Sequence, residues 1–593
     1  MTGHQGELAR RTWDAVCRHI DGMAIGSTMA ALAERGALKI LAGSDRTRFT
    51  DLCRELEANA GFLHVAIRLL ADQGWVVPRG DPDIGELAVE PTDDGRAVFT
   101  EFAHAYPAAA RFLPAAGRMN DMLGAAGGDE ILAHYAGLMR REWDLPSRAV
   151  PRGARQQVLA HLNGHLLAPL MLAMTQGGML SAGTEIRLGG RLLQLAAGIL
   201  AWQGWAQTSG DTAWLTPEGE LAVSFARQYR YPLVYLPLLR RVPELIFGDP
   251  EPAPASAAET HLDRELDVRF SGDVFSAMCR RPFLDIARPL FNRLPLAGQP
   301  AMVVDMGCGD GTVLAALHAA VRSGTERGRV LGDHPLLMVG VDPSPVAREI
   351  TASRLSAAGI PHVVLDGDIA DPERLRRDLA ERGLNAGNAL HICKSAIHDR
   401  AYREPDAPAM AGSGPPVSYG AFALADGSDV SAAKIAVSLA DIFRSWRPLT
   451  RKHGWLVIEA HAAPPAAAAR LIGRTIATAL DSTHGYSCQY PVEPQVFAWA
   501  AQSAGYSSQR HAEPGAAQLG HTVLTIDHFT TGPAPGRRQN LRWPASVSSD
   551  SERSLEFTFS IIRHLRSTGH RISRFGPTCT DRNSREPSED VNR

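Results

Sequence analysis

The sequence predicts an α/β protein in which a seven-stranded, doubly wound sheet follows a mostly helical N-terminal region. Three observations predict this fold. A glycine-rich turn joins an apolar strand to a helical stretch at residues 303–312. Apolar stretches of strand length recur after that turn, with segments of helical periodicity between them. The first 250 residues instead carry Ala- and Leu-rich stripes at helical spacing, with only short strand-like stretches.

The composition limits the classes of protein that the chain can belong to. With 593 residues the chain is too long for one core, and several domains are expected. The formal net charge of −3 provides no general attraction to nucleic acid or to an anionic membrane. The N-terminus has no apolar signal segment, and no uninterrupted apolar stretch is long enough to span a bilayer. The seven cysteines are scattered without a CxxC pair, which fits a reducing cytoplasm. We therefore expect a cytoplasmic protein, and the low charge and short apolar stretches lead us to expect no membrane partner.

The N-terminal region begins with helices and continues into a hairpin. Residues 8–78 show short helical stripes, and a short strand is expected at Leu87–Val89. The residues Thr-Asp-Asp-Gly at 92–95 then begin another helix. Helices followed by a β-hairpin favour a winged-helix-like unit, which we place at residues 1–125.

A second unit of the same kind is predicted at residues 126–250. The Gln-Gly-Trp sequence at 203–205 repeats the one at 73–75. The Thr-Pro-Glu-Gly sequence at 216–219 parallels the start of the helix at 92–95. Two such similarities at nearly equal spacing indicate a duplicated module.

DNA recognition by these units is not expected. The stretch Phe62–Trp75, which would be the recognition helix, has only Arg68 and His64 as basic residues, with Asp72 beside them. Binding to phosphates requires a basic surface. We therefore expect a packing, lid or dimerisation role, no nucleic-acid partner, and a homodimer formed through this region.

The remainder of the chain divides into three parts. Residues 251–300 are a linker with connecting helices, and the linker itself is the Pro- and Ala-rich stretch 251–258. Residues 301–530 form the sheet domain. Residues 531–593 are rich in Arg, Ser and Pro and are expected to be a disordered tail, with one helix at Ser554–Leu565.

The sheet domain contains seven expected strands, of which the last is antiparallel. The segments that we assign to them are 301–306, 336–341, 362–365, 389–393, 454–459, 507–510 and 521–529. The segment 507–510 is the hairpin partner of 521–529. In an open α/β sheet the active site lies at the carboxyl ends of the parallel strands. Functional residues are therefore sought directly after each strand.

The glycine-rich turn is the most informative of these strand ends. Gly307, Gly309 and Gly311 allow a sharp turn and a close approach of the backbone to a ligand. Asp305 precedes them, and the resulting pattern D-x-G-x-G-x-G resembles motif I of class I S-adenosylmethionine (SAM) methyltransferases, which have a Rossmann-like domain. The resemblance implies that Asp305 faces the amino group of SAM and that the glycines pass under its methionine part.

The next two strand ends extend this resemblance. The second strand ends in Asp342, whose carboxylate can accept both ribose hydroxyl protons. The third strand is followed by Asp368 and Ile369, where the family places contacts to adenine. Together with Lys394, these residues complete the predicted SAM-binding set.

The fourth strand ends in a stretch, Lys394 to Asp399, that resembles the O-methyltransferase motif of lysine, three residues, then His-Asp. In that family the lysine lies near the cofactor and the histidine, here His398, is the general base for a hydroxyl group. The sequence departs from the pattern at Arg400, where the family usually has tryptophan. The winged-helix-like units resemble the N-terminal domain of the same family, and their duplication resembles the lid of methyltransferases in polyketide loading modules.

The fifth strand is followed by His461. With His398 and Asp399 it would make a set of two histidines and one carboxylate. This set resembles the metal-dependent C-methyltransferases of 2-oxo acid and polyketide biosynthesis. The resemblance implies catalysis by His398, Asp399 and His461 with a divalent metal, iron or manganese, that stabilises an enolate.

The sequence therefore leads to two functional predictions for an enzyme; a third hypothesis, a DNA-binding winged-helix regulator that uses SAM as a signal, is opposed by the low basic charge. The first is metal-assisted C-methylation of a 2-oxo acid or malonyl-type substrate in secondary metabolism, either as a small molecule or bound to a carrier protein. The alternative is a metal-independent O-methyltransferase that uses His398 as its base, with Glu459 or Asp399 orienting the imidazole.

Overall fold

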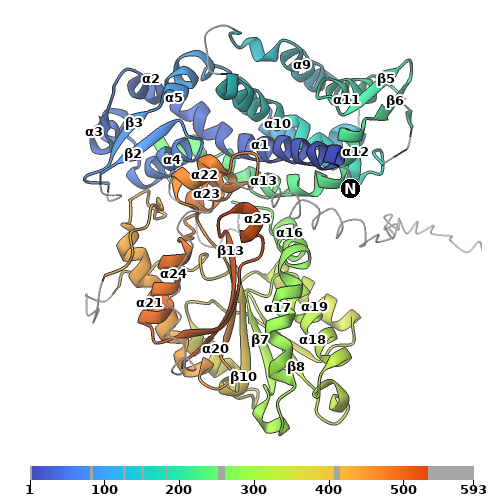
Figure 1. Ribbon diagram of the computed structural model, residues 1–593, viewed down its shortest axis with the longest axis vertical. Coiled ribbons are helices and arrows are strands. Elements are labelled where there is room, and N and C mark those ends of the chain that lie inside the picture. Colours follow the sequence, from blue (N-terminus) through green and yellow to red (C-terminus); the bar gives the residue numbers. More distant parts are fainter. Residues whose placement is uncertain are drawn as a thin grey trace, which may run out of the picture.

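The computed structural model describes residues 3–80, 84–124, 128–147, 152–181, 183, 185–187, 189–250, 261–405 and 414–531. The chain forms a helical half and a sheet half, joined along one seam (Figure 1). The predicted linker at 251–258 and the predicted tail helix at Ser554–Leu565 lie outside the described residues.

Two long helices form the centre of the N-terminal half. Helix α1 (Gly3–Glu34) packs along α10 (Arg152–Gln176). Small residues allow the close contact: a Cβ on Gly22 would lie 2.2 Å from the Cα of His161. The stretch 153–176 is long and apolar enough to cross a membrane, but 78% of its apolar window is buried inside the protein. That burial is typical of a core helix.

The N-terminal half contains two units with the same connectivity. In the first, α4 (Ala60–Asp72) leads into a three-stranded sheet of order β1-β3-β2, formed by residues 47–48, 88–91 and 76–79. In the second, α11 (Arg191–Trp202) leads into a sheet of order β4-β6-β5, formed by residues 186–187, 212–215 and 206–209. The bounds of the two predicted domains remain a prediction.

The similarity of the two units extends to single hydrogen bonds. The Thr92 N–H donates to the Trp75 carbonyl at 3.0 Å, and the Thr216 N–H donates to the Trp205 carbonyl at 3.0 Å. Each threonine hydroxyl then accepts the N–H of the glycine three residues later and caps a helix, α5 (Asp93–Ala97) or α12 (Pro217–Phe225). A Cβ on Gly95 would lie 1.8 Å from the Trp75 carbonyl oxygen, so the motif requires glycine there.

Shorter helices complete this half and lead to the sheet half. They are α2 (Ala37–Ala42), α3 (Phe49–Leu56), α6 (Ala105–Ala110), α7 (Leu113–Ala116), α8 (Met119–Gly124), α9 (Asp129–Arg140), α13 (Arg230–Val234), α14 (Leu236–Leu239), α15 (Val242–Phe247), α16 (Arg264–Val274) and α17 (Arg280–Ala287).

The sheet half is a seven-stranded sheet of order β12-β13-β11-β10-β7-β8-β9. The strands are β7 (Met302–Met306), β8 (Leu337–Val341), β9 (His362–Leu365), β10 (Ala389–Lys394), β11 (Trp455–Ala460), β12 (Ser507–Ala512) and β13 (Leu524–Thr530). Strands β7 to β11 are parallel, whereas β13 is antiparallel to both of its neighbours. The predicted seven-stranded fold is confirmed. The strand order reverses between β7 and β10, and such a reversal creates a ligand crevice at the carboxyl ends.

Helices cover both faces of the sheet. Alternating residues of β7 enter opposite cores: Val303 packs with α17 and α18 (Thr312–Gly324), and Val304 packs in the core that contains residues of α21 (Ala432–Thr450). Helix α19 (Pro345–Ala357) lies on the α18 side, and α20 (Pro372–Ala380) and α24 (Pro494–Ser503) lie on the α21 side. Strands buried on both faces explain the continuous apolar stretches in the sequence.

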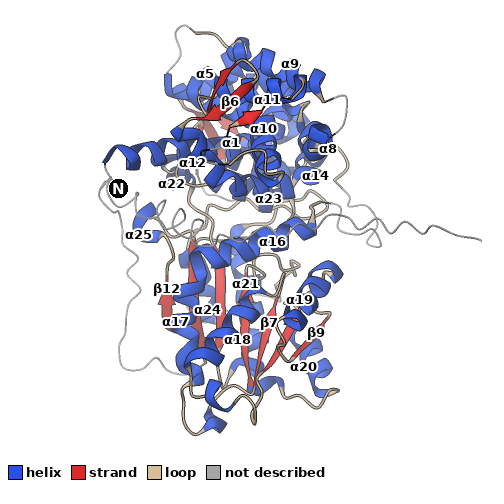
Figure 2. Cartoon of the chain, turned by 90° about the vertical axis from the view of Figure 1, so that its right-hand side faces the viewer, coloured by secondary structure: helices blue, strands red, loops and turns tan. Residues whose placement is uncertain are grey.

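The segment after β11 connects the two halves. Helices α22 (Pro465–Arg470) and α23 (Ala477–Tyr486) pack against α1 and α4 (Figures 1 and 2). The Ala479 N–H donates to Asp21 Oδ1 at 3.0 Å, and the hydroxyls of Tyr486 and Thr28 lie 2.9 Å apart. The carboxyl ends of the sheet strands therefore face the N-terminal half, and α23 lies between them.

Candidate active site

The glycine-rich turn lies between β7 and α18. Gly307, Gly309 and Gly311 have φ of +78°, +55° and +74°, the left-handed region that favours glycine. A Cβ on Gly307 would also lie 2.8 Å from the Cβ of Ala396, in the turn after β10. The turn thus packs against the end of β10. Glycine is required at position 307 both because its φ is positive and because a Cβ there would collide with Ala396.

Asp305 is fully buried at the end of β7. Neither of its carboxylate oxygens has a hydrogen-bond partner among the described residues. Burial raises its pKa to about 7, the negative charge of Asp342 adds to the increase, and the Lys394 ammonium opposes it. A buried carboxylate without donors is unfavourable. A positively charged group of a bound molecule would stabilise this carboxylate, which fits the role predicted for Asp305 toward an amino group.

The other predicted donor-site residues lie around the same crevice. Asp342 accepts the Ser344 N–H at 2.9 Å and the Gly309 N–H at 3.1 Å, so it fastens the end of β8 to the glycine turn. Asp368 is exposed and accepts the Ala370 N–H at 2.8 Å. The side chain of Ile369 is buried in the core beside α21. The contacts predicted for these residues with ribose and adenine stay predictions.

Helix α16 lies beside the glycine turn. A Cβ on Gly272 would lie 2.5 Å from Asp310 Oδ2, which shows how closely the helix approaches. Lys394 Nζ donates to Ser271 Oγ of this helix at 2.6 Å. Ser395, the next residue, has a φ of +54°, an uncommon conformation for a residue other than glycine. The end of β10 is therefore held between the turn and α16.

His398 and Glu459 form a buried pair at the ends of β10 and β11. The His398 Nδ1–H donates to Glu459 Oε1, which also accepts the Ala460 N–H at 3.0 Å. Burial lowers the pKa of His398, but the charge and hydrogen bond of Glu459 more than offset this effect, so the pKa is raised above its usual value. With Nδ1–H directed at the carboxylate, neutral His398 has its lone pair on Nε2. This arrangement suits a general base.

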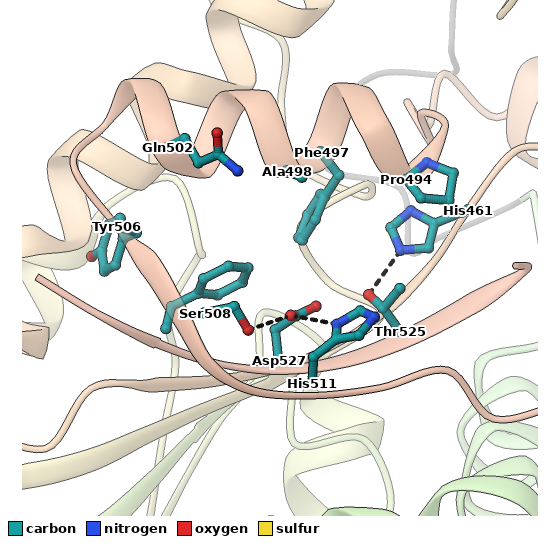
Figure 3. A pocket seen from close by; sticks show the side chains of 11 residues that line it. His461, Pro494, Phe497, Ala498, Gln502, Tyr506, Ser508, His511, Thr525 and Asp527 are labelled. Carbon is teal, nitrogen blue, oxygen red and sulfur yellow. Dashed lines mark hydrogen bonds and ion pairs between the residues drawn. The ribbon is translucent and has the colours of Figure 1, made fainter. Parts of the chain in front are cut away.

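His461 lies in a pocket between α24 and the strands β12 and β13 (Figure 3). Its Nδ1 lies 3.2 Å from the Val492 carbonyl oxygen, and its Nε2 lies 2.9 Å from Thr525 Oγ1. Burial lowers its pKa to about 4. Neutral His461 therefore uses both ring nitrogens in contacts with the protein.

The predicted metal set of His398, Asp399 and His461 is not assembled. Among the residues that the structure describes, no three His, Cys, Asp or Glu side chains are grouped so that they could hold a metal ion. The physical reason is local: Val492 and Thr525 occupy the ring nitrogens of His461, while Asp399 is exposed. The donors present do not fit the predicted iron or manganese site.

Arg400, which departs from the O-methyltransferase motif, has a structural position. It is buried and donates to the carbonyls of Ile397 and Ile435 at 3.0 and 3.1 Å. Its guanidinium lies 5.7 Å from the ring centroid of Tyr490. These contacts fasten the turn that carries His398 to α21. The sequence assigned no role to His484, whose ring lies edge-on to that of His398, and its position after the fifth strand is the only signal that could have indicated it.

Two family models match parts of this chain. Residues 259–523 match the family model described as the AprA MT2-like domain, a methyltransferase domain, and residues 13–78 match the AprA N-terminal domain. No curated protein matches the chain.

Several solved structures are similar at low identity. An O-methyltransferase family protein from Burkholderia thailandensis is 14% identical, with 62% of this chain and 95% of that chain covered and a TM-score of 0.36. An O-methyltransferase family 2 protein from Planctomyces limnophilus, in complex with apigenin, is 10% identical, with 87% and 95% covered and a TM-score of 0.37. The DszA carbon methyltransferase is 14% identical, with 62% and 89% covered and a TM-score of 0.28.

Proposed function

We propose that this SAM-dependent methyltransferase, whose methyltransferase domain spans residues 259–523, methylates a hydroxyl group that His398 deprotonates. The hydrogen bond between His398 and Glu459 carries the proposal. It fixes the tautomer of the imidazole, leaves Nε2 as the basic atom, and stabilises the imidazolium that forms when a proton is taken up.

The donor side of the site supports SAM binding. When bound, SAM supplies an electrophilic methyl group on a sulfonium. Asp305 would hold its ammonium group, because that carboxylate is buried without a hydrogen-bond donor among the described residues. The glycine turn would accommodate the methionine part, and Asp342 would accept from the ribose hydroxyls. Lys394 and Ser271 hold α16 near this crevice.

The geometry favours a hydroxyl over a carbon acceptor. Removal of a proton from carbon leaves an enolate that needs stabilisation, and the predicted route to carbon assigns this task to a metal held by His398, Asp399 and His461. Both ring nitrogens of His461 are occupied by protein atoms. A hydroxyl group requires only the base and correct placement beside the methyl donor. The proposal covers a hydroxyl on a small molecule and one on a carrier-bound acid, and the cytoplasm remains the expected location.

The proposal is tested with His398→Ala and Glu459→Gln proteins. Methyl transfer is measured by mass spectrometry with a phenol, a 2-oxo acid and a malonyl thioester as acceptors, before and after treatment with EDTA. We expect transfer to the phenol to survive EDTA and to fall about a hundredfold or more in His398→Ala, the usual contribution of a general base.

The control is the SAM affinity by calorimetry, which both variants should retain. Transfer only to the 2-oxo acid or malonyl thioester, abolished by EDTA and restored by iron or manganese, would show that the C-methylation route is correct instead.

A further inference from the structure

A second histidine lies beside the proposed base. His484, on α23, is buried, and its ring centroid lies 4.9 Å from that of His398, with the rings at 79° to one another. The hydroxyl-methylation proposal assigns no role to this residue. Its side chain comes from the segment between β11 and β13, whereas His398 follows β10. Two imidazoles from different elements therefore meet on the acceptor side.

The hydrogen bonds determine which nitrogen of His484 carries the proton. Its Nδ1 lies 2.6 Å from the Leu480 carbonyl oxygen, and a carbonyl can only accept, so Nδ1 carries the hydrogen. Burial and the charge of neighbouring His398 lower the pKa of His484 to about 3, so it stays neutral. Its Nε2 then has a lone pair, as does the Nε2 of His398. Neither Nε2 has a hydrogen-bond partner among the described residues.

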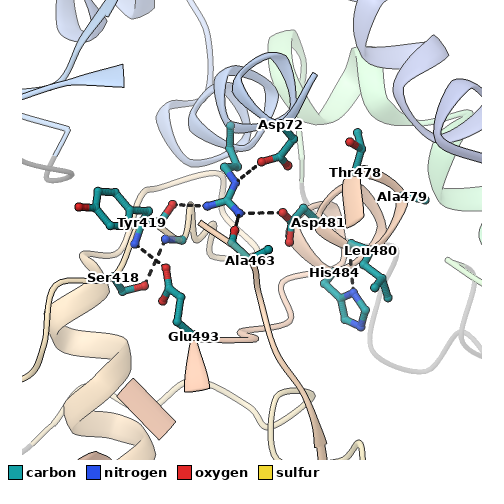
Figure 4. A network of polar contacts seen from close by, with 12 residues as sticks. Asp72, Ser418, Tyr419, Ala463, Thr478, Ala479, Leu480, Asp481, His484 and Glu493 are labelled. Atoms are coloured by element: carbon teal, nitrogen blue, oxygen red, sulfur yellow. Dashed lines mark hydrogen bonds and ion pairs between the residues drawn. The ribbon is translucent and has the colours of Figure 1, made fainter. Parts of the chain in front are cut away.

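Helix α23 is held firmly in place. Arg68 of α4 donates to Asp481 Oδ2 at 2.8 Å, and also to the carbonyls of Tyr419 and Ala463. Figure 4 shows His484 below α23, with one ring nitrogen bonded to Leu480 and the other directed away from the helix. The second nitrogen of His484 is therefore a fixed acceptor.

We propose that His398 and His484 together recognise two neighbouring hydroxyl groups on the acceptor, such as those of a catechol. One hydroxyl would lose its proton to His398 Nε2. An O–CH3 bond would then form as the S–CH3 bond of the sulfonium breaks, and the sulfur would leave with that electron pair as the thioether S-adenosylhomocysteine. The adjacent hydroxyl donates a hydrogen bond to His484 Nε2. His484 is thus a specificity-determining residue. This inference rests on the hydroxyl methylation proposed above and adds the class of substrate.

Two substitutions separate this role from simple packing. The amide nitrogen of Asn occupies a place near Nδ1 of histidine, so His484→Asn retains the donor to Leu480 and loses the Nε2 acceptor. Gln reaches the position of Nε2 with a polar group, so His484→Gln retains an acceptor there and loses the donor to Leu480. A packing role predicts that both variants impair all acceptors equally.

The experiment compares catechol with phenol as acceptors for the full-length protein, with SAM. We expect wild type to prefer catechol by about tenfold in kcat/KM, the effect of one hydrogen bond. In His484→Asn the KM for catechol should rise about tenfold while the values for phenol stay unchanged. His484→Gln should retain part of the preference.

Other outcomes overturn the inference in distinguishable ways. Equal loss with both acceptors in His484→Asn, or methylation of phenol as efficiently as catechol by wild type, would leave His398 as base and remove the role of His484. Absence of transfer to either probe, with transfer to a malonyl thioester, would overturn the hydroxyl proposal itself and this inference with it. Loss of catechol methylation in EDTA, restored by iron, would show that the two histidines hold a metal instead.

Discussion

His398 is subject to two opposing effects on its pKa. Burial favours the neutral imidazole, while the carboxylate of Glu459 favours the charged one, and the second effect is larger. The base therefore titrates above the usual pKa of a histidine. At the scale of single residues, the proposed mechanism makes this pair the determinant of the pH at which the enzyme is active.

The pH dependence of kcat follows from this shift. Only neutral His398 can accept a proton, so kcat should fall as the pH decreases through its raised pKa. Glu459→Gln removes the negative charge, so the decline should move to lower pH while the maximal kcat decreases. Profiles of kcat against pH for both proteins measure this. Asp399→Asn is the matched control, since that carboxylate is exposed and its effect on the pKa of His398 ranks below that of Glu459. An identical acid limb in wild type and Glu459→Gln would contradict the prediction.

Asp305 should affect SAM binding and stability in opposite directions. An ionised Asp305 is needed to hold an ammonium, and its pKa is raised to about 7, so SAM affinity should increase as the pH rises through that value. Asp305→Asn should weaken SAM binding by about tenfold or more, the contribution of a hydrogen bond to a charged group. The same variant without SAM should melt at a higher temperature above neutral pH, because a folded-state pKa above the unfolded value means that ionisation destabilises the fold.

Calorimetric titration and thermal melts across pH 6 to 8 measure both effects. Asp368→Asn, at an exposed position, is the control. A melting temperature for Asp305→Asn equal to that of wild type at every pH would refute the linkage.

These residues differ in how well the sequence could predict them. The prediction for Asp305 rests on neighbours in the chain, the glycines two, four and six positions later, so the sequence alone could place it at the glycine turn. The metal role of His461 stays a prediction, because its environment depends on Val492 and Thr525, which are 31 and 64 residues away and which the neighbouring sequence does not indicate. A strand end can be found from periodicity, but the direction of its side chain is determined by packing with distant elements.

At the scale of elements, the glycine turn joins two strand ends. Gly307 combines a φ of +78° with contact to Ala396. Gly307→Ala should lower the free energy of unfolding by about 1–3 kcal/mol, because it forces a strained conformation. It should also weaken SAM binding. Gly324→Ala at the end of α18 is the control, because a Cβ at that position would meet no atom within 4 Å. Denaturant unfolding and calorimetry measure the difference, and equal stability of the two variants would argue against strain at Gly307.

The Arg68 network should determine the position of α23. Its buried guanidinium bonds Asp72 of its own helix and Asp481 of α23. Removing the cation leaves buried carboxylates unpaired, so Arg68→Ala should lose about 3–5 kcal/mol of stability. Turnover with catechol should fall more than SAM affinity, since the network holds His484 and not the glycine turn.

Matched controls make that prediction specific. Arg68→Lys retains the charge, and should recover part of the stability and turnover. Arg10→Ala removes an exposed ion pair with Glu7 and should change stability by at most about 0.5 kcal/mol. A parallel loss of SAM affinity and turnover in Arg68→Ala would indicate a general loss of structure. Neither the network nor α22 and α23 followed from the sequence, because their partners lie roughly 400 positions earlier.

At the scale of the whole molecule, the proposed acceptor site lies at the seam of the two halves. The sheet domain supplies His398 and Glu459, and the N-terminal helices hold α23 with His484. A fragment of residues 259–531 should therefore bind SAM but transfer the methyl group to catechol poorly, because α23 has lost its support. SAM affinity and turnover of the fragment, compared with the intact chain, test this. Full turnover by the fragment would show that the N-terminal half is dispensable.

The two N-terminal units have the same connectivity but different surroundings. The end of α4 in the first unit is buried against the sheet half, with Asp72 and Gln73 fully enclosed. The corresponding end of α11 in the second unit presents Trp202, which is 50% exposed. The duplication of the unit could be predicted from the sequence. The sequence could not predict that only the first unit buries this helix end against the sheet half. Our expectation of a homodimer remains a prediction.

The attachment of α23 to the N-terminal helices has an evolutionary corollary. Helix α23 and the helices that hold it are encoded more than 400 codons apart, yet they share direct bonds, so a change in one must be matched in the other. A recombined gene with a foreign front half would therefore have to inherit Asp21 and Arg68 for α23 to keep its position.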